Sequence, residues 1–103
     1  MLSEKKQYLS QYLFQAKKIE RYEKLEKMCT KEKNYYLKAI NASIRFRNEI
    51  EEKISKIDNE MLKEILYEKY IFGKTLEDIS LNLNYSKRHI ERLHIKALEQ
   101  LEI

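Results

Sequence analysis

The chain has 103 residues, of which 37% are charged and 43% are apolar, and it contains one glycine and no proline. This composition predicts an all-α soluble protein and argues against a β fold or a disordered chain. At this length we expect one domain, or a domain with an appendage, whose small core makes self-association a reasonable expectation. The formal net charge of +4 points to an anionic partner.

Several classes of protein are excluded by what the sequence lacks. No apolar run approaches membrane length, and Glu4 and Lys5 interrupt any signal-peptide core, so we expect a cytoplasmic protein. The single cysteine, Cys29, has no second thiol for a disulfide or a metal site. His89 and His94 are five residues apart, which is not the spacing of a metal pair on a helix. With no glycine-rich phosphate loop or nucleophile motif, we expect no metal, no cofactor and no enzymatic activity.

The first predicted element is a long amphipathic helix from Leu2 to about Lys31. Its apolar residues recur at steps of three or four, and the stripe winds around the helix, which fits a hairpin or a bundle better than an extended coiled coil. Lysines, arginines and tyrosines alternate along the other positions, where we expect a charged outer face. The predicted stripe consists of Leu9, Tyr12, Leu13, Ala16, Ile19, Tyr22, Leu25, Met28 and Cys29.

The chain is expected to reverse at residues 30–34, where the apolar pattern lapses and Thr30 or Asn34 can cap a new helix. A second apolar pattern follows and ends at Ile57, with Arg47 as its polar member. One bent helix through this region is an alternative, but an antiparallel helical hairpin over residues 1–57 buries both stripes and is the prediction we adopt. The second stripe consists of Leu37, Ile40, Ile44, Ile50, Ile54 and Ile57.

Three shorter helices are predicted in residues 58–103, which we expect to form a separate unit. Asp58 and Asn59 provide a cap signal, and Gly73 provides a stop just past the last apolar turn. The helices should therefore span about 59–72, 76–83 and 86–102. This order and spacing is that of a three-helix unit supporting a helix-turn-helix.

The corner between the last two helices is the most specific local signal in the chain. Ser80 is small enough for a close helix crossing, and Asn84 tolerates the positive φ that a tight turn requires. Tyr85 should then pack inward. Thr75 and Ser86 are predicted N-caps of the two helices, and Asp78 stands at the acidic position of a capping box.

Charge is distributed unevenly along the chain. Residues 1–57 carry 14 Lys or Arg against 8 acidic residues, whereas residues 58–103 carry 7 against 9. Within this acidic half, four cations gather on the exposed side of the last helix opposite Glu91 alone, where a nucleic-acid groove would be met. These cations are Lys87, Arg88, Arg92 and Lys96.

The stretch from Lys74 to Leu101 resembles region 4 of the primary bacterial sigma factors. The shared features are the Thr-Leu-Glu opening at Thr75, the Ser-capped second helix at Ser86 and the Ala-Leu-x-x-Leu ending that begins at Ala97. The likeness extends upstream to about residue 58. The chain resembles still more a group of small phage and prophage proteins of sigma-region-4 type, with their Tyr-Ser corner, Arg-Leu-His step and Ala-Leu ending. Asn84 departs from the glycine that this family usually has at the turn.

The resemblance implies DNA-binding residues on and around the last helix, here 86–102, docked in the major groove. Positions that match base-facing ones are occupied by Lys87, Arg88, Glu91 and Arg92, and expected phosphate contacts are Lys74, Thr75, Ser86 and Lys96. Arg88 stands where the family commonly has an acidic residue, so the base preference of the family does not transfer.

We therefore expect a sequence-specific DNA-binding transcription regulator of phage or prophage type, acting in the cytoplasm of a bacterial host cell. Its partners would be double-stranded DNA, a second copy of the chain bound through the N-terminal hairpin, and RNA polymerase, which proteins of this family can contact. Two alternatives are a small terminase-like DNA-packaging subunit and a polymerase-binding helical adaptor that does not bind DNA. The acidic balance of residues 58–103 favours the adaptor.

Overall fold

The computed structural model describes residues 2–28 and 33–103. These residues contain no strand, and they confirm the all-α prediction. Cys29 and the first part of the predicted reversal at 30–34 lie outside the described residues. The helices are α1 (Leu2–Met28), α2 (Lys33–Ser55), α3 (Glu60–Leu66), the π-helical segment η1 (Tyr67–Ile71), α4 (Leu76–Leu83) and α5 (Lys87–Gln100).

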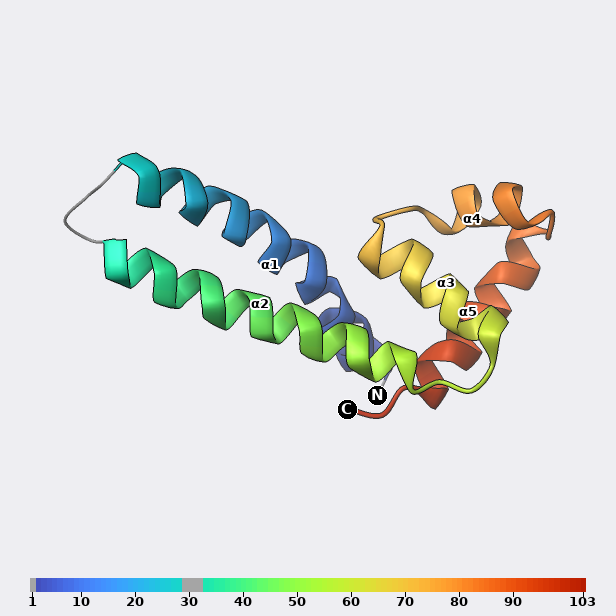
Figure 1. The fold of residues 1–103 in the computed structure, drawn as a ribbon. Coiled ribbons are helices and arrows are strands. Elements are labelled where there is room, and N and C mark those ends of the chain that lie inside the picture. The colour runs from blue at the N-terminus through green and yellow to red at the C-terminus, as the bar shows by residue number, and fades with distance from the viewer. Residues whose placement is uncertain (1, 29–32) are drawn as a thin grey trace.

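The molecule is elongated, with one slender part and one thicker part. Helices α1 and α2 lie side by side in opposite directions, and α3, η1, α4 and α5 gather at one end of this pair (Figure 1). The radius of gyration is 16.2 Å, whereas a compact domain of this length would have about 13 Å. We call residues 14–28 and 33–45 the arm, and the remaining described residues the compact end. Among the described helices, none is both long and apolar enough to cross a bilayer.

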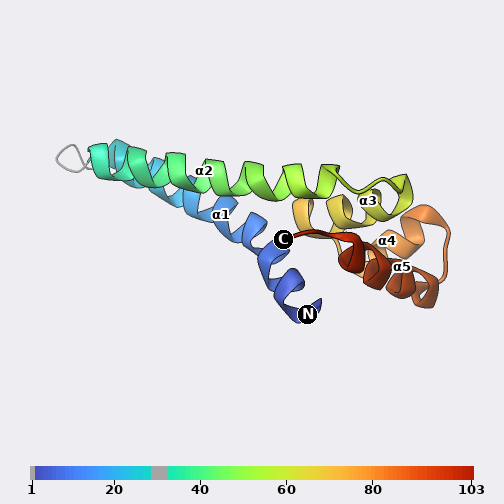
Figure 2. The same cartoon turned by 90° about the horizontal axis from the view of Figure 1, so that it is seen from below.

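The main hydrophobic core lies in the compact end and joins both halves of the sequence. The first turns of α1 diverge from α2 and approach α5 (Figure 2), where the Lys5 ammonium donates a hydrogen bond to the Glu99 carbonyl at 3.3 Å. Residues on either side of the predicted boundary at 57 and 58 are therefore buried together. The core consists of Leu9, Ile50, Ile54, Ile57, Leu62, Leu66, Tyr70, Ala97, Leu98 and Leu101.

A second, smaller core attaches α4 to its neighbours. Ile65 of α3, Ile79 of α4 and Ile90 of α5 are completely buried against one another. Leu76 and Leu83, also on α4, pack at the edge of this cluster. Because α4 has only eight residues, this cluster fixes its orientation relative to α5.

The predicted helix over 59–72 forms, but its second half is π-helical, which the sequence analysis did not predict. Asn59 caps the start, since its side-chain oxygen accepts a hydrogen bond from the Leu62 N–H at 3.1 Å. At the other end the Phe72 N–H donates to the Tyr67 carbonyl, a bond spanning five residues. Gly73 follows with φ of +73°, so it ends the helix in the left-handed conformation that the cap prediction required.

Two predicted stripe residues in the described ranges are exposed. Met28 is 82% exposed and Leu37 is 41% exposed. Both belong to the arm, where each helix has one neighbour and can cover a single narrow stripe. The apolar pattern therefore predicted the helices correctly but overestimated how much of each stripe would be covered.

Candidate nucleic-acid interface

The corner between α4 and α5 has the geometry that its residues predict. Asn84 has φ of 59° and ψ of 36°, the left-handed conformation, and Tyr85 N–H donates to the Ser80 carbonyl at 3.1 Å. Ser80 is 5% exposed, and its hydroxyl donates to the Glu77 carbonyl at 2.7 Å. A small, internally satisfied side chain thus occupies the point where a larger residue would separate the helices.

Both helices of the corner begin at a side-chain cap, as predicted. The Thr75 hydroxyl accepts a hydrogen bond from the Asp78 N–H at 3.1 Å, and the Ser86 hydroxyl accepts one from the His89 N–H at the same distance. Each cap satisfies one of the free N–H groups at a helix start. The remaining free N–H groups give each start a partial positive charge.

The inward orientation predicted for Tyr85 is wrong. Its side chain is 41% exposed, and its ring lies edge-on against the His89 ring with centroids 4.8 Å apart. The small core under α4 is already filled by Ile79 and Ile90, which leaves no room for a tyrosine. Tyr85 and His89 together form an aromatic surface beside the start of α5, and the sequence analysis assigned His89 no such role.

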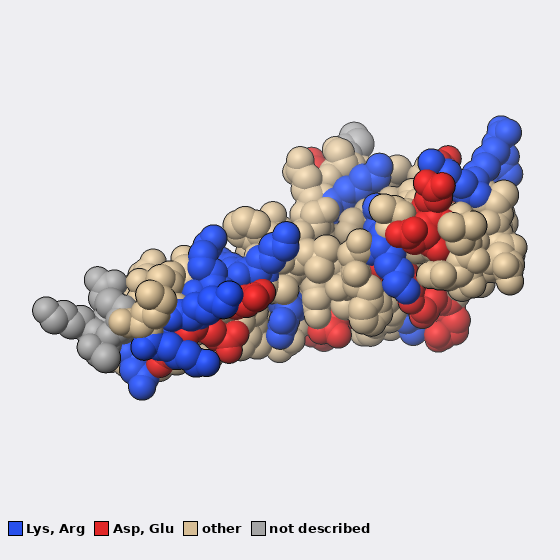
Figure 3. Space-filling view, turned by 90° about the horizontal axis from the view of Figure 1, so that it is seen from above, with Lys and Arg blue, Asp and Glu red and all other residues tan. Residues whose placement is uncertain are grey.

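Helix α5 separates a buried face from a polar one. Ile90, His94, Ala97 and Leu98 are buried, and the predicted base-facing residues all lie on the exposed side. The exposed cations of α5 form no ion pair with any residue in the described ranges. Figure 3 shows Lys and Arg side chains gathered over the arm and again at the opposite end of the molecule.

The helical repeat orders these exposed residues. Since successive residues turn by about 100°, Arg88 and Arg92 share the centre of the exposed face with Ile95 and Glu99. Lys87 and Glu91 lie together on one flank, and Lys96 lies on the other. The expectation that Glu91 alone opposes the cations is therefore wrong, because Glu99 is exposed on the same face. Ile95, 44% exposed, is a candidate contact residue that only this geometric ordering identifies.

An open groove of about 380 Å³ runs beside this face. Arg92, Ile95, Lys96 and Glu99 line it together with His89 and Leu93. It is thus a groove along one side of a single helix, with an apolar floor and charged edges. Such a surface suits an elongated ligand that lies along α5 better than an enclosed small molecule.

The four predicted phosphate contacts differ in how available they are. Lys96 is exposed and has no ion-pair partner among the described residues, and the hydroxyls of Thr75 and Ser86 serve as caps. Lys74 instead forms an ion pair with Glu68. The hydrogen bond that Lys74 donates to the Glu68 carboxyl holds the pKa of that carboxyl below its ordinary value. A phosphate at Lys74 would therefore have to compete with Glu68.

Behind α5 lies a buried polar pair that the sequence analysis did not detect. The Tyr70 hydroxyl and His94 Nε2 are 2.8 Å apart, and both side chains are at most 5% exposed. Burial, assisted by the charges of Lys69 and Lys6, lowers the pKa of His94 to about 4. Burial also raises the pKa of Tyr70 to about 12. The pair is therefore neutral at pH 7 and ties η1 to α5.

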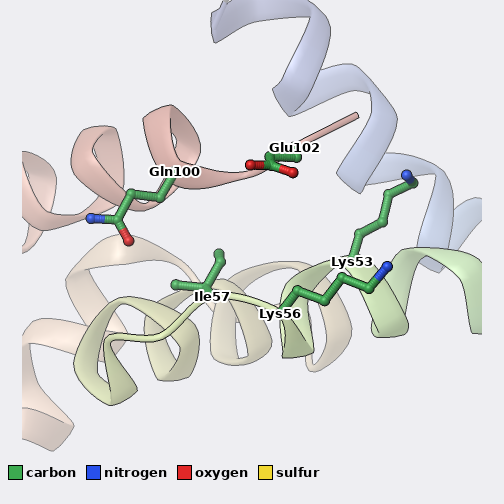
Figure 4. Close-up of a pocket in the computed structure, with 5 residues that line it drawn as sticks. All are labelled: Lys53, Lys56, Ile57, Gln100 and Glu102. Atoms are coloured by element: carbon green, nitrogen blue, oxygen red, sulfur yellow. The ribbon is translucent and has the colours of Figure 1, made fainter.

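A small hollow near the C-terminal end is not a binding site for a sizeable ligand. It has a volume of about 100 Å³ and is lined by Lys53, Lys56, Ile57, Gln100 and Glu102. Figure 4 shows the side chains of Lys53 and Lys56 pointing away from Gln100. The lining combines both signs of charge and does not select an anion.

Comparisons with protein-family models, with curated proteins and with solved structures found no match. The resemblance to sigma region 4 therefore rests on the sequence alone, from about residue 58 to the motif in residues 74–101.

Proposed function

We propose that the protein is a sequence-specific DNA-binding transcription regulator of phage or prophage type, with α4 and α5 as its helix-turn-helix. The observation that carries this proposal is the combination of a capped, tightly turned corner with cations on α5 that have no ion-pair partner among residues 2–28 and 33–103. Cations held on a rigid helix without compensation are favourably placed to replace the counterions of DNA.

In this proposal α5 lies in the major groove. Arg88 and Arg92, at the centre of its exposed face, pair with guanine, and Glu91 on the flank accepts from cytosine. Ile95 makes apolar contact with a thymine methyl group. The order of side chains around α5 supports these roles, because Arg92 and Ile95 share the same open groove.

Phosphate contacts surround this surface. Lys96 approaches one strand, and the helix starts at Thr75 and Ser86 direct their free N–H groups to the backbone. These phosphate contacts set the register of the protein on the duplex and do not read sequence. Lys87, near the start of α5, instead reads bases at the edge of the site.

We further propose that the arm mediates homodimerisation. Apolar side chains of the arm remain exposed, including Phe14 at 57%, Met28 at 82% and Tyr35 at 61%. A second copy covering these side chains would pair two helix-turn-helix units, as palindromic operators require.

A second candidate function is a polymerase-binding adaptor that does not bind DNA. It is favoured by two exposed apolar side chains of the compact end, Leu81 at 71% and Phe72 at 65%. Both precede α5 in the chain, and neither belongs to the polar face of α5. This second function predicts no affinity for DNA and a binding to polymerase that depends on Leu81.

Two substitutions on α5 test the proposed function. Arg92→Ala removes a base contact, so it should weaken binding to the preferred duplex by about 1–3 kcal/mol and relax its sequence preference. Lys96→Ala removes a phosphate contact, so it should weaken binding to all duplexes alike and reduce the salt slope by about 1. Fluorescence anisotropy over a range of salt concentrations measures both.

The matched control is Lys56→Ala, which removes one exposed cation just beyond α2, outside α5 and the arm. Its binding should stay near that of the unsubstituted chain. If Arg92→Ala and Lys96→Ala bind DNA as well as this control, α5 does not contact DNA and the proposal fails.

A further inference from the structure

A hollow of about 380 Å³ lies where α1 meets the segment between η1 and α4. One wall is formed by the early turns of α1, and the other by η1 and by the residues leading into α4. The hollow therefore joins the two parts of the sequence that were predicted as separate units. Its lining residues are Lys6, Ser10, Leu13, Lys69, Tyr70, Gly73, Lys74 and Thr75.

The hollow exists because Gly73 lets the chain pass close to α1. A Cβ atom at Gly73 would lie 3.3 Å from Leu13 Cδ1, tighter than nine in ten real Cβ contacts, so Leu13 would have to shift by a few tenths of an ångström. The positive φ of Gly73 then turns the chain toward Thr75 and the start of α4. Lys69 from η1, Lys74 after the turn and Lys6 from α1 line the same hollow.

The charge in the hollow is positive and partly uncompensated. Lys74 is held by Glu68, but Lys6 and Lys69 form no ion pair with any part of the chain that the structure describes. Besides burial, which has the largest effect, the charges of Lys69 and Lys6 both lower the pKa of His94, which lies behind the hollow. The Lys69 ammonium also lies over the ring of Tyr70, 5.6 Å from its centroid, and Tyr70 lines the same hollow. Two lysines that line one hollow without a carboxylate partner among the described residues favour an anion there.

The hollow also offers hydrogen-bond donors. Ser10 supplies a hydroxyl from α1, and the Thr75 hydroxyl, which accepts from Asp78 N–H, keeps its own proton to donate. The first N–H groups of α4 add the partial positive charge of a helix start. Glu77 and Asp78, the acidic residues of that first turn, are not part of the lining. Ammonium groups and hydroxyl donors are the groups that hold phosphate oxygens in proteins.

We propose that this hollow seats a phosphate of the DNA backbone, and that Lys6, Ser10 and Lys69 extend the DNA-binding surface from α4 onto α1. The inference rests on the proposed function, since the phosphate belongs to the duplex that α5 reads. It gives the N-terminal half a direct part in binding, in addition to dimerisation. Through Lys6, one of the 14 Lys or Arg residues of the basic segment 1–57 then acts on DNA directly.

The test compares two double variants of the full chain that lose the same charge. Lys6→Ala with Lys69→Ala removes the two cations of the hollow that have no ion-pair partner among the described residues. Lys53→Ala with Lys56→Ala removes two cations at the C-terminal end of α2 and just beyond it, outside the hollow, α5 and the arm. Since each lost phosphate contact lowers the salt slope by about 0.9, the first pair should reduce the slope by roughly 1 and leave sequence preference unchanged. The second pair should keep the original slope.

A second measurement replaces DNA with inorganic phosphate. Backbone amide resonances of Ser10 and Thr75 are followed by NMR during the titration, and they should shift in the unsubstituted chain and not in the Lys6 and Lys69 double variant. Circular dichroism confirms that both double variants keep their helices.

The outcomes separate the two proposals. Equal slopes for the two double variants, with DNA still bound, overturn the phosphate site and leave the proposed function intact. Absence of DNA binding together with phosphate shifts at Ser10 and Thr75 overturns the proposed function and assigns the hollow to free phosphate or a phosphorylated small ligand. Absence of both DNA binding and phosphate shifts overturns both.

Discussion

The arm and the compact end are built from similar helices but differ in how completely these helices are covered. The most buried apolar side chains of the arm, Ile19 and Ile40, are 8% and 9% exposed, whereas Ile65, Leu66 and Ile79 in the compact end are fully buried. Two helices shield only one stripe each, while several helices crossing at different angles enclose a core. Side chains therefore have precisely fixed positions at the compact end, whereas side chains along the arm can adapt to a contact.

Ion pairs alone do not separate the charged residues of the two parts. In the arm, Lys24 pairs with Glu20, but Lys27 and Lys38 have no ion-pair partner in the described ranges, and neither have the cations of α5. Surface pairs of the kind found in the arm contribute little stability. The cations of α5 are the better candidates for function because they stand on a helix that begins at a capped corner.

The largest effect we predict is on stability, and it tests whether the core of the compact end is more tightly packed than the arm. Leu66→Ala should lower the free energy of unfolding by about 2–5 kcal/mol, because it leaves a cavity in a closed core. Leu37→Ala, a matched change at a side chain that is 41% exposed in the arm, should cost only about 0.5 kcal/mol or less. Urea unfolding followed by circular dichroism measures both. Equal losses would mean that the arm is as tightly packed as the compact end.

The next effect concerns the buried His94 and its dependence on pH. Because the pKa of His94 is lowered to about 4 in the folded chain, the unfolded chain binds a proton more readily between pH 6.5 and 4. Stability should therefore fall as pH falls through this window, by on the order of 3 kcal/mol from this group. Unfolding free energies measured between pH 7 and 5, above most carboxyl titrations, should show the first part of this loss.

Two variants isolate the contribution of His94. His94→Gln removes the titrating group and should flatten the dependence, while His89→Gln changes an exposed histidine and should preserve it. A direct NMR titration of the His94 ring provides the same answer without substitution. A ring that protonates near pH 6.5 in the folded chain would contradict the buried, neutral pair with Tyr70.

The smallest effect we predict is at the joint between the two parts. Gly73→Ala should destabilise the protein by about 1–2 kcal/mol, since an L-residue is strained at positive φ and its Cβ would press on Leu13. Asn84→Gly is the control, because Asn84 also has positive φ and glycine adopts that conformation freely. Thermal unfolding should show a loss for the first variant and no loss for the second. A Gly73→Ala variant with unchanged thermal stability would show that the chain around residue 73 accommodates the Cβ atom without loss of stability.

The parts of the fold that could be predicted from sequence are those set by local chemistry. The caps at Thr75 and Ser86, the turn at Asn84 and the stop at Gly73 depend on residues close in sequence, and the structure contains each of them.

The remaining features depend on contacts between distant residues. Tyr70 meets His94 across 24 positions, and no local pattern distinguishes a paired buried histidine from an exposed one. The hollow combines Lys6 with Lys69 only because α1 packs beside η1. The outward orientation of Tyr85 follows from a core already filled by Ile79 and Ile90. Periodicity could not show which stripe residues of the arm lack a neighbour.

The measurement that tests the central claim most directly is selection of bound duplexes from a random DNA pool by the purified full chain, followed by sequencing. We predict that one sequence class is enriched, and that Arg92→Ala selects a more relaxed class at the positions it contacts. A pool that remains indistinguishable from the input would contradict a sequence-reading role for α5.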